Sequence, residues 1–193
     1  MSPFHRGLLK AAQKIHLYVT LLTLVLILFF AASGFMLNHE DWFSPTEPYR
    51  TVRTGTIASA LLAPVDRLGI VESLRKDFGA VGLVETFEDE DDRIRVVFKR
   101  PGTQVTAEVL KASGMAEVAI DTRGWTGLFL DLHRGKATGQ VWRFVLDAVC
   151  LSLVIIALTG LILFQSLKGR GRFGWMILIL GAMAGFVGYL TVP

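Results

Sequence analysis

The chain has 193 residues, of which 52% are hydrophobic, and a formal net charge of +3 at pH 7. Its mean hydropathy of +0.49 is too high for an ordinary soluble domain of this length. All acidic residues lie between residues 38 and 147, and the two flanks carry only basic charge. The basic character of the chain therefore reflects how charge is distributed along it and does not indicate nucleic-acid binding.

Three uncharged segments of 20 or 21 residues predict three transmembrane helices. An α-helix needs about 20 apolar residues to cross a hydrocarbon core about 30 Å thick. We assign the helices to residues 17–38, 141–167 and 173–193. A cleaved signal peptide is the alternative for the first segment, because Ala31–Ser33 resembles a cleavage site. The apolar region of a signal peptide is usually shorter, however, at about 7–15 residues.

Basic residues without acids flank these helices. The tail formed by residues 1–16 contains Arg6, Lys10 and Lys14, and the link 168–172 reads KGRGR. Short loops rich in Lys and Arg stay in the cytoplasm. We therefore predict that residues 1–16 form a cytoplasmic tail and that 168–172 form a cytoplasmic loop. The segment between the first two helices then lies on the outer side of the membrane. The predicted partner of the three apolar helices is the lipid bilayer.

Residues 39–124 predict a small α+β domain inserted between the first two membrane helices. The stretch 65–79 has apolar residues at helical spacing and ends at Gly79, a natural stop. The apolar period then changes to two, with a hairpin turn at Pro101–Gly102. The helical apolar positions are Leu68, Val71, Leu74 and Phe78, and the expected strands lie near 81–87, 93–99, 104–110 and 116–121. This pattern predicts one helix on an antiparallel sheet.

Two further features of this domain bear on function. The acidic run Glu88–Asp92 lacks the turning glycine of a calcium-binding loop, so we interpret it as a solvated hairpin tip. The domain contains no nucleophile motif, and no catalytic residue is identified in it.

Residues 125–140 predict an amphipathic segment at the outer membrane surface. Trp125, Leu128, Phe129 and Leu132 follow a spacing of i, i+3, i+4 and i+7 and form one apolar helical face. Aromatic residues are typical of the lipid–water boundary. We expect a short helix that lies on the membrane and then turns into the second membrane helix.

Four histidines are the candidate ligands of the chain: His5, His16, His39 and His133. His5 lies in the tail, where we expect it to be solvated. His16 lies at the inner edge of the first membrane helix, about 34 Å from His39 along a continuous helix, so it belongs to a separate site. His39 and His133 both lie at the outer edge and can meet there. The carboxylates expected to orient these rings are Glu40, Asp41 and Asp131. The alternative for each ring is a purely interfacial role.

The third membrane segment contains a small-residue pattern, with Gly181 and Gly185 four residues apart. Small residues let helix backbones approach closely. The pattern predicts packing either on the other two membrane helices or in a homodimer. The single cysteine, Cys150, excludes an intrachain disulfide.

Several of these stretches together resemble one family. The run SGFMLNH (33–39) precedes the domain, and GLFLDLHRGKATGQVWRF (127–144) follows it. This arrangement resembles the PepSY-associated transmembrane-helix proteins, and the central unit is similar in layout to a PepSY domain. The resemblance implies a bacterial inner-membrane protein with a periplasmic domain, often linked to iron uptake. Larger relatives resemble ferric-siderophore reductases that carry haem between membrane histidines.

On this basis we predict that His39 and His133 bind one iron, that of haem b, and that His16 contributes to a separate site needing a partner from outside this chain. A bare transition-metal ion at His39 and His133, or no cofactor, is the alternative. The predicted function is electron transfer or ferric-siderophore reduction. The second reading is a non-enzymatic membrane protein whose periplasmic domain binds or regulates a partner protein.

Overall fold

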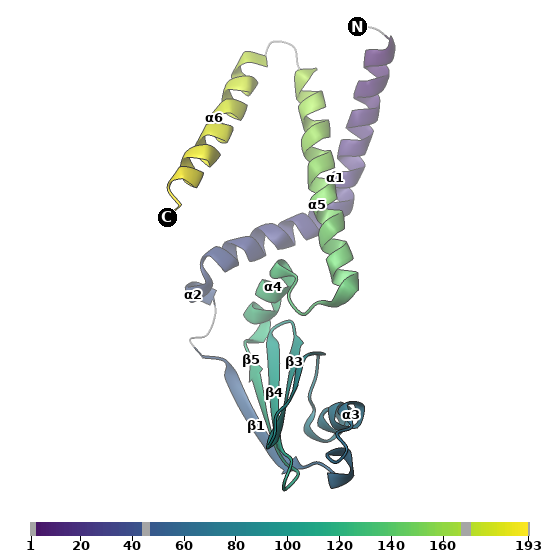
Figure 1. Ribbon diagram of the computed structural model, residues 1–193. Helices are drawn as coiled ribbons and strands as arrows, with labels where there is room; N and C mark the ends of the chain where they lie inside the picture. The colour runs from purple at the N-terminus through teal and green to yellow at the C-terminus, as the bar shows by residue number, and fades with distance from the viewer. Residues whose placement is uncertain (1–2, 44–46, 167–170, 193) are drawn as a thin grey trace. The chain divides into compact units, whose positions relative to one another are not determined.

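Three long helices account for the apolar segments of the computed structural model, which describes residues 3–43, 47–166 and 171–192 (Figure 1). They are α1 (Pro3–Asn38), α5 (Gly139–Gln165) and α6 (Gly171–Leu190), and all three are long and apolar enough to cross a membrane. The chain forms two units: one contains the chain up to Ile27 and from Asp147 onward, and the other is Leu28–Leu146. We describe each unit by itself.

Helix α1 begins within the predicted tail, because residues 3–16 are helical. The sequence GLLKAAQK (7–14) is rich in Leu, Ala, Lys and Gln, which are strong helix formers, so the helix extends beyond its apolar part. Part of the predicted cytoplasmic loop, residues 168–170, lies outside the described residues. Its last two residues, 171 and 172, belong to α6.

A five-stranded antiparallel sheet forms most of the second unit. The strands have the spatial order β1-β5-β4-β3-β2, and every neighbouring pair is antiparallel. Their bounds are β1 (Tyr49–Thr56), β2 (Leu83–Asp89), β3 (Arg93–Arg100), β4 (Thr103–Leu110) and β5 (Met115–Thr122). The predicted small antiparallel sheet is therefore confirmed, together with the turn at Pro101–Gly102. Strand β1 was missed, because it is an edge strand with seven of its eight residues exposed and shows no apolar alternation.

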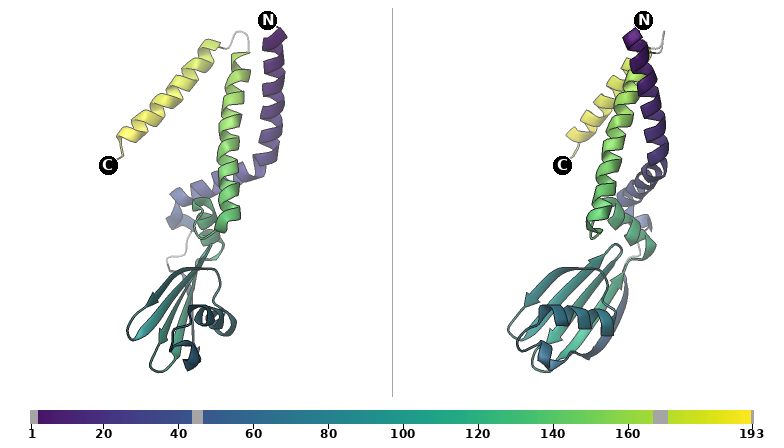
Figure 2. Two further views of the ribbon diagram at one scale, coloured as in Figure 1. Left: turned by 45° about the vertical axis from the view of Figure 1, so that its right-hand side comes forward. Right: turned by 90° about the vertical axis from the view of Figure 1, so that its right-hand side faces the viewer.

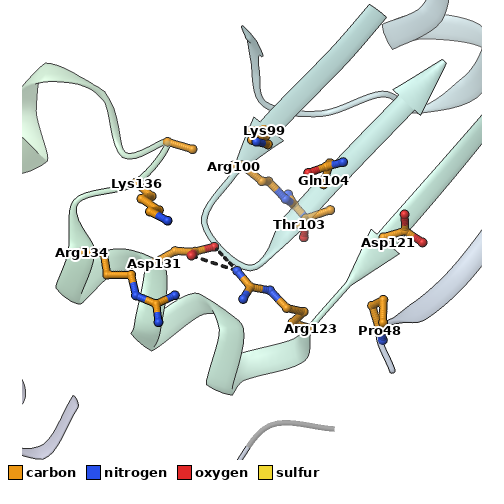
Figure 3. Close-up of a pocket in the computed structure, with 11 residues that line it drawn as sticks. Pro48, Lys99, Arg100, Thr103, Gln104, Asp121, Arg123, Asp131, Arg134 and Lys136 are labelled. Carbon is orange, nitrogen blue, oxygen red and sulfur yellow. Dashed lines mark hydrogen bonds and ion pairs between the residues drawn. The ribbon is translucent and has the colours of Figure 1, made fainter. Parts of the chain in front are cut away.

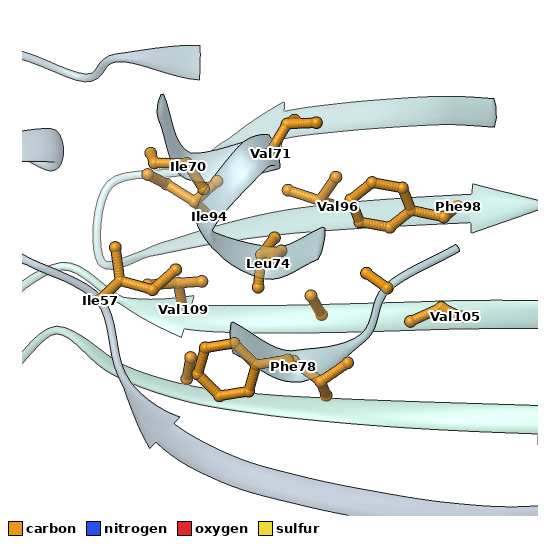
Figure 4. Close-up of a cluster of buried hydrophobic side chains, with 14 of the residues drawn as sticks. Ile57, Ile70, Val71, Leu74, Phe78, Ile94, Val96, Phe98, Val105 and Val109 are labelled. Atoms are coloured by element: carbon orange, nitrogen blue, oxygen red, sulfur yellow. The ribbon is translucent and has the colours of Figure 1, made fainter. Parts of the chain in front are cut away.

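Helix α3 (Arg67–Phe78) lies across one face of the sheet (Figure 2). Asp66 caps its first turn by accepting a hydrogen bond from the Gly69 amide at 3.0 Å, and Gly79 ends it in the left-handed conformation, as predicted. The side chains that it buries against β3, β4 and β5 are Ile70, Val71, Leu74 and Phe78 (Figure 4). The predicted contact of Leu68 is wrong, because this residue is 72% exposed in the first turn and Ile70 packs in its place.

The acidic run forms the predicted hairpin tip in its last three residues, whereas Glu88 and Asp89 belong to β2. Strand β2 ends at Asp89 and β3 begins at Arg93, so Glu90, Asp91 and Asp92 form the hairpin tip. Arg93 donates hydrogen bonds to the Asp92 carboxylate, and these bonds hold the pKa of Asp92 below its usual range. Lys111 pairs with Asp89 at 2.6 Å. The described residues contain no cluster of three or more carboxylates, histidines or cysteines placed to hold a metal ion.

A short helix, α4 (Gly124–Arg134), packs on the β3–β4 turn. Its buried residues are Thr126, Gly127, Leu130 and Asp131. Gly102 in the turn has a φ of +75°, and a Cβ atom there would lie 2.8 Å from the Leu128 amide nitrogen, so only glycine permits this approach. The predicted apolar face is not the one that packs on the sheet domain: Trp125 is 62% and Leu128 37% exposed. This exposed face remains suited to a membrane surface.

The Asp131 carboxylate joins the turn to α4. Its Oδ2 accepts a hydrogen bond from the Gly102 amide at 2.9 Å, and both oxygens accept from Arg123 Nη2 at 2.9 Å. The Arg123 amide in turn donates to the Gly102 carbonyl at 2.9 Å. Asp131 is only 8% exposed, so its charge is stabilised by these donors and not by water.

The core of the sheet domain generates a first prediction. Leu74→Ala removes a side chain with no exposed surface and should lower the free energy of unfolding of this domain by about 2–5 kcal/mol. Leu68→Ala, on the same helix but exposed, should change it by no more than about 0.5 kcal/mol. Pulse proteolysis of the full chain in detergent across a urea series measures both values. Equal losses for the two variants would contradict the described packing.

The Asp131 contacts generate a second prediction. Asp131→Ala leaves the Gly102 amide and Arg123 without their acceptor. It should lower the free energy of unfolding by about 1–3 kcal/mol, and not more, because Arg123 is partly solvated. Hydrogen–deuterium exchange should show faster exchange of the amides in the β3–β4 turn. The control is Asp77→Ala, an exposed carboxylate of α3 that accepts only from Ser73. Unchanged exchange at Gly102 in Asp131→Ala would show that the carboxylate does not hold the turn.

Candidate functional site

His16 of α1 bonds to α5 within the first unit. Its Nδ1 lies 3.0 Å from Thr159 Oγ1 and 3.2 Å from the Ile156 carbonyl oxygen. A carbonyl oxygen only accepts, so the hydrogen of the neutral ring is on Nδ1. The Thr159 hydroxyl supports this tautomer, because it donates its own hydrogen to backbone carbonyls of α5, the shortest bond being 2.6 Å to Ile155. Nε2 of His16 therefore carries the free lone pair.

His133 makes a similar bond in the second unit. It lies in the last turn of α4, and its Nδ1 is 2.8 Å from Ser33 Oγ of α1. Ser33 is 2% exposed and donates its hydroxyl hydrogen to the Phe29 carbonyl at 2.7 Å. Because a hydroxyl has one hydrogen, Ser33 accepts from His133 Nδ1, and Nε2 is again left with the lone pair. The Phe30 ring packs edge-on at 5.5 Å between centroids.

A glycine lies under each of these rings. A Cβ atom at Gly34 would be 3.1 Å from His133 Cε1, and one at Gly160 would be 3.4 Å from His16 Cε1. Each histidine thus packs on a hydroxyl residue and the glycine that follows it, and we call the pairs Ser33–Gly34 and Thr159–Gly160 hydroxyl–glycine steps. Glycine permits the close approach of the ring at Gly34, whereas a Cβ atom at Gly160 would make ordinary van der Waals contact. The hydroxyl sets the orientation of each ring. Sequence analysis missed both steps, although each is visible as a Ser-Gly or Thr-Gly pair inside an uncharged helix.

His39 has different surroundings. It follows the end of α1, and its ring stacks on Trp42 with centroids 4.1 Å apart and planes at 12°. Phe35 lies on it at 4.6 Å. His133 bonds to Ser33, six residues earlier on the same helix, which is about 9 Å along the axis and on another face. The contacts of the two rings are thus not shared, and a single iron between His39 and His133 stays a prediction.

The carboxylates expected to orient the histidines have other partners. Glu40 pairs with Arg134 at 2.9 Å and lies 3.8 Å from Arg123. Asp131 accepts from Arg123 and Gly102, as described above, and Asp41 is exposed. The expectation for Glu40 and Asp131 is therefore corrected: Ser33 and Thr159, and not carboxylates, orient the imidazoles. Arginines compete for the carboxylates because they offer paired, charge-assisted donors.

A basic pocket of about 380 Å³ lies within the second unit (Figure 3). Its walls come from the end of β3, the start of β4, the end of β5 with Arg123 after it, and the C-terminal end of α4 with the loop that follows. Five of its lining side chains are cations and two are carboxylates: Lys99, Arg100, Arg123, Arg134 and Lys136, with Asp121 and Asp131. Sequence analysis missed the pocket, because these residues come from three separate segments of the chain.

The sheet face opposite α3 presents polar side chains. Arg95, Glu108 and Glu117 lie in register on neighbouring strands and are exposed. Together with Arg50, Thr106 and Ala119 they line a second hollow of about 380 Å³. Arg95 faces Glu108, and Glu108 faces Glu117, so this face carries charges of both signs and is suited to polar contacts and not to an apolar ligand.

Comparison with known proteins supports the interpretation from the sequence. No curated protein and no solved structure shows a significant match to the chain. The family model described as "Putative PepSY_TM-like" matches residues 8–192, which include all three long helices almost entirely, the sheet and α4. The predicted resemblance is thereby confirmed, and the chain belongs to the PepSY_TM-like family.

Proposed function

We propose that this membrane protein binds haem b through His133 and His16 and takes part in electron transfer, in the inner membrane of a bacterium and with its sheet domain in the periplasm. The observation that carries the proposal is the common geometry of the two rings. In each, Nδ1–H is bonded to a hydroxyl residue and Nε2 keeps its lone pair. Ligating histidines usually have such a bond on the nitrogen that does not bind the metal.

His133 would hold the haem of one site, and His16 would hold that of the other. Neutral imidazole is a common haem ligand, and Phe30 and Phe29 provide apolar surroundings near His133. When bound, haem would supply one-electron redox chemistry. The chain's own residues hold the imidazoles: Ser33 and Thr159 fix the tautomer, and the adjacent glycines leave room for the rings.

Each site would need a further residue to hold the haem. At the outer site the candidate is His39, whose ring would have to leave Trp42. At the inner site a second copy of the chain would supply another His16. A homodimer through Gly181 and Gly185 is compatible with the chain's own packing, because no described atom lies within 4 Å of a Cβ built at either glycine. The alternative use of these glycines, packing against the other two long helices, is not seen among the described residues.

The absorbance spectrum of the purified protein tests the haem proposal directly. Protein expressed with a haem precursor should show a Soret band and an α band that appears on dithionite reduction. His133→Ala and His16→Ala should each lose about half of the haem, because each removes one of two sites. His5→Ala is the control and should keep full haem content. His39→Ala should alter the spectrum only if it supplies the opposite ligand at the outer site. A featureless spectrum of the unaltered protein would sink the proposal.

The hydroxyl–glycine steps lead to a separate prediction. Ser33→Ala and Thr159→Ala should each weaken haem binding at one site by about 10–100-fold, the usual effect of removing a hydrogen-bond partner of a ligating histidine. Ser152→Ala is a matched control, because Ser152 also donates to a backbone carbonyl of α5, that of Ala148, and contacts no histidine. Haem titration into the haem-free protein measures these affinities. Equal affinities in all three variants would show that the hydroxyls do not support ligation.

A second candidate function is a non-enzymatic membrane protein whose sheet domain binds or regulates a partner protein. The exposed, polar face of the sheet favours this reading. Under it, His16 and His133 stabilise helix packing by hydrogen bonds alone. The spectrum described above separates the two functions, because only the first requires haem. For the first function, the electron donor would be a separate molecule.

A further inference from the structure

We propose that the basic pocket beside α4 binds a phosphate group. The pocket lies wholly within Leu28–Leu146, and its lining includes neither the hydroxyl–glycine steps nor the residues of the second hollow. The inference is therefore independent of haem binding.

The first argument is charge. Acids pair with three of the five cations: Asp131 with Arg123, Glu40 with Arg134 and Glu85 with Lys99. Asp121, the remaining carboxylate of the lining, lies 3.8 Å from Arg50. Arg100 and Lys136 have no carboxylate within ion-pair distance among the described residues. Both are exposed at the pocket and permanently charged at neutral pH, so the site has a surplus of positive charge.

The second argument is the arrangement of donors. Lys99 and Arg100 come from the end of β3, whereas Arg134 and Lys136 come from the end of α4 and the loop after it (Figure 3). Thr103 and Gln104 add a hydroxyl and an amide to the lining. Donors on two sides of a hollow can contact several oxygens of one tetrahedral anion, and guanidinium groups pair well with phosphate. The volume of about 380 Å³ is in the range of small-molecule sites, about 300–1,000 Å³.

The third argument is that Asp131 holds the walls together. This buried carboxylate is bonded to the β3–β4 turn and to Arg123, so the two sides of the pocket are fixed before any ligand binds. Preorganised donors lose little conformational freedom on binding. Arg123 is also restrained by this bond, and Arg134 by its bond to Glu40 at 2.9 Å.

The source of the phosphate is either a phospholipid headgroup or a soluble phosphate. The first source is suggested by the chain itself: Lys136 lies three residues before α5, one of the helices that can cross a membrane. On the same helix as Asp131, Trp125 and Leu128 expose apolar surface that is suited to the lipid–water boundary. A soluble phosphate would use the same cations.

The test compares the full chain in nanodiscs of two compositions. One contains only zwitterionic phosphatidylcholine, and the other contains added phosphatidylglycerol, which is anionic. A third arm adds millimolar inorganic phosphate to the zwitterionic nanodiscs, with acetate at equal ionic strength as its control. A ligand that binds only the folded protein raises its thermal stability, and the thermal shift is measured in each arm together with lipid retained in native mass spectrometry.

The variant is Arg100→Gln/Lys136→Gln, which removes the two unpaired cations and no side-chain ion pair or hydrogen bond among the described residues. Its control is Arg95→Gln/Lys76→Gln, which makes the same change of charge on the sheet face and on α3. The double variant should bind the phosphate group about tenfold more weakly or worse, since charge-assisted contacts are strong, and the control should bind as the unaltered chain does.

The outcomes separate the two sources. A shift that requires phosphatidylglycerol and disappears only in Arg100→Gln/Lys136→Gln identifies a lipid headgroup. A shift produced by inorganic phosphate, but not by acetate, and lost in the same variant identifies a soluble phosphate. If neither ligand produces a shift, or if the variant and its control respond equally, the pocket is not a phosphate site.

Discussion

The buried carboxylate of Asp131 is the constraint on which the described arrangement of the second unit depends. It accepts hydrogen bonds from the Gly102 amide and from Arg123, and its 8% exposure leaves little water to replace them. A buried charge is tolerated only when several donors surround it. Helix α4 is therefore held against the β3–β4 turn in one position.

That position determines the surroundings of His133 and the walls of the basic pocket. His133 follows Asp131 by two residues and faces α1, where Ser33 and Gly34 receive its ring. Arg134 follows by three residues and lines the basic pocket with Arg123. An eleven-residue helix thus contacts the sheet turn through one face and α1 through another. Moving α4 would change the histidine site and the pocket together.

The hydroxyl–glycine steps provide a hydrogen-bond partner for a polar side chain that packs against an apolar helix. An imidazole within a hydrocarbon environment needs a hydrogen-bond partner, because burying a polar group there without one costs about 2–7 kcal/mol of free energy. Ser33 and Thr159 provide this partner while they return their own hydrogens to the backbone of their helices. The same bonds stabilise helix contacts with or without a cofactor. What distinguishes a ligand site from a packing contact is the use made of Nε2, which both histidines leave available.

The sequence by itself determined the elements with a strong local pattern. Uncharged stretches of about 20 residues specify the long helices because length and apolarity suffice to cross a bilayer. Helical spacing specified α3, and alternation specified β3 and β4, because their buried faces require apolar side chains at those periods. Edge strand β1 lacks a buried face and therefore lacks the pattern. The start of α1 within the tail was missed because helix propensity, and not apolarity, extends it.

Only the tertiary structure decided the partners of the histidines and the existence of the pocket. Ser33 and His133 are 100 residues apart, and His16 and Thr159 are 143 residues apart, so no local period relates them. Sequence proximity suggested Glu40 and Asp131 as partners of the histidines, but arginines bind these carboxylates instead. The cations of the pocket are individually ordinary surface residues of β3, the segment after β5, and α4 with its following loop. They acquire a shared role because one buried carboxylate brings a strand turn and a helix together.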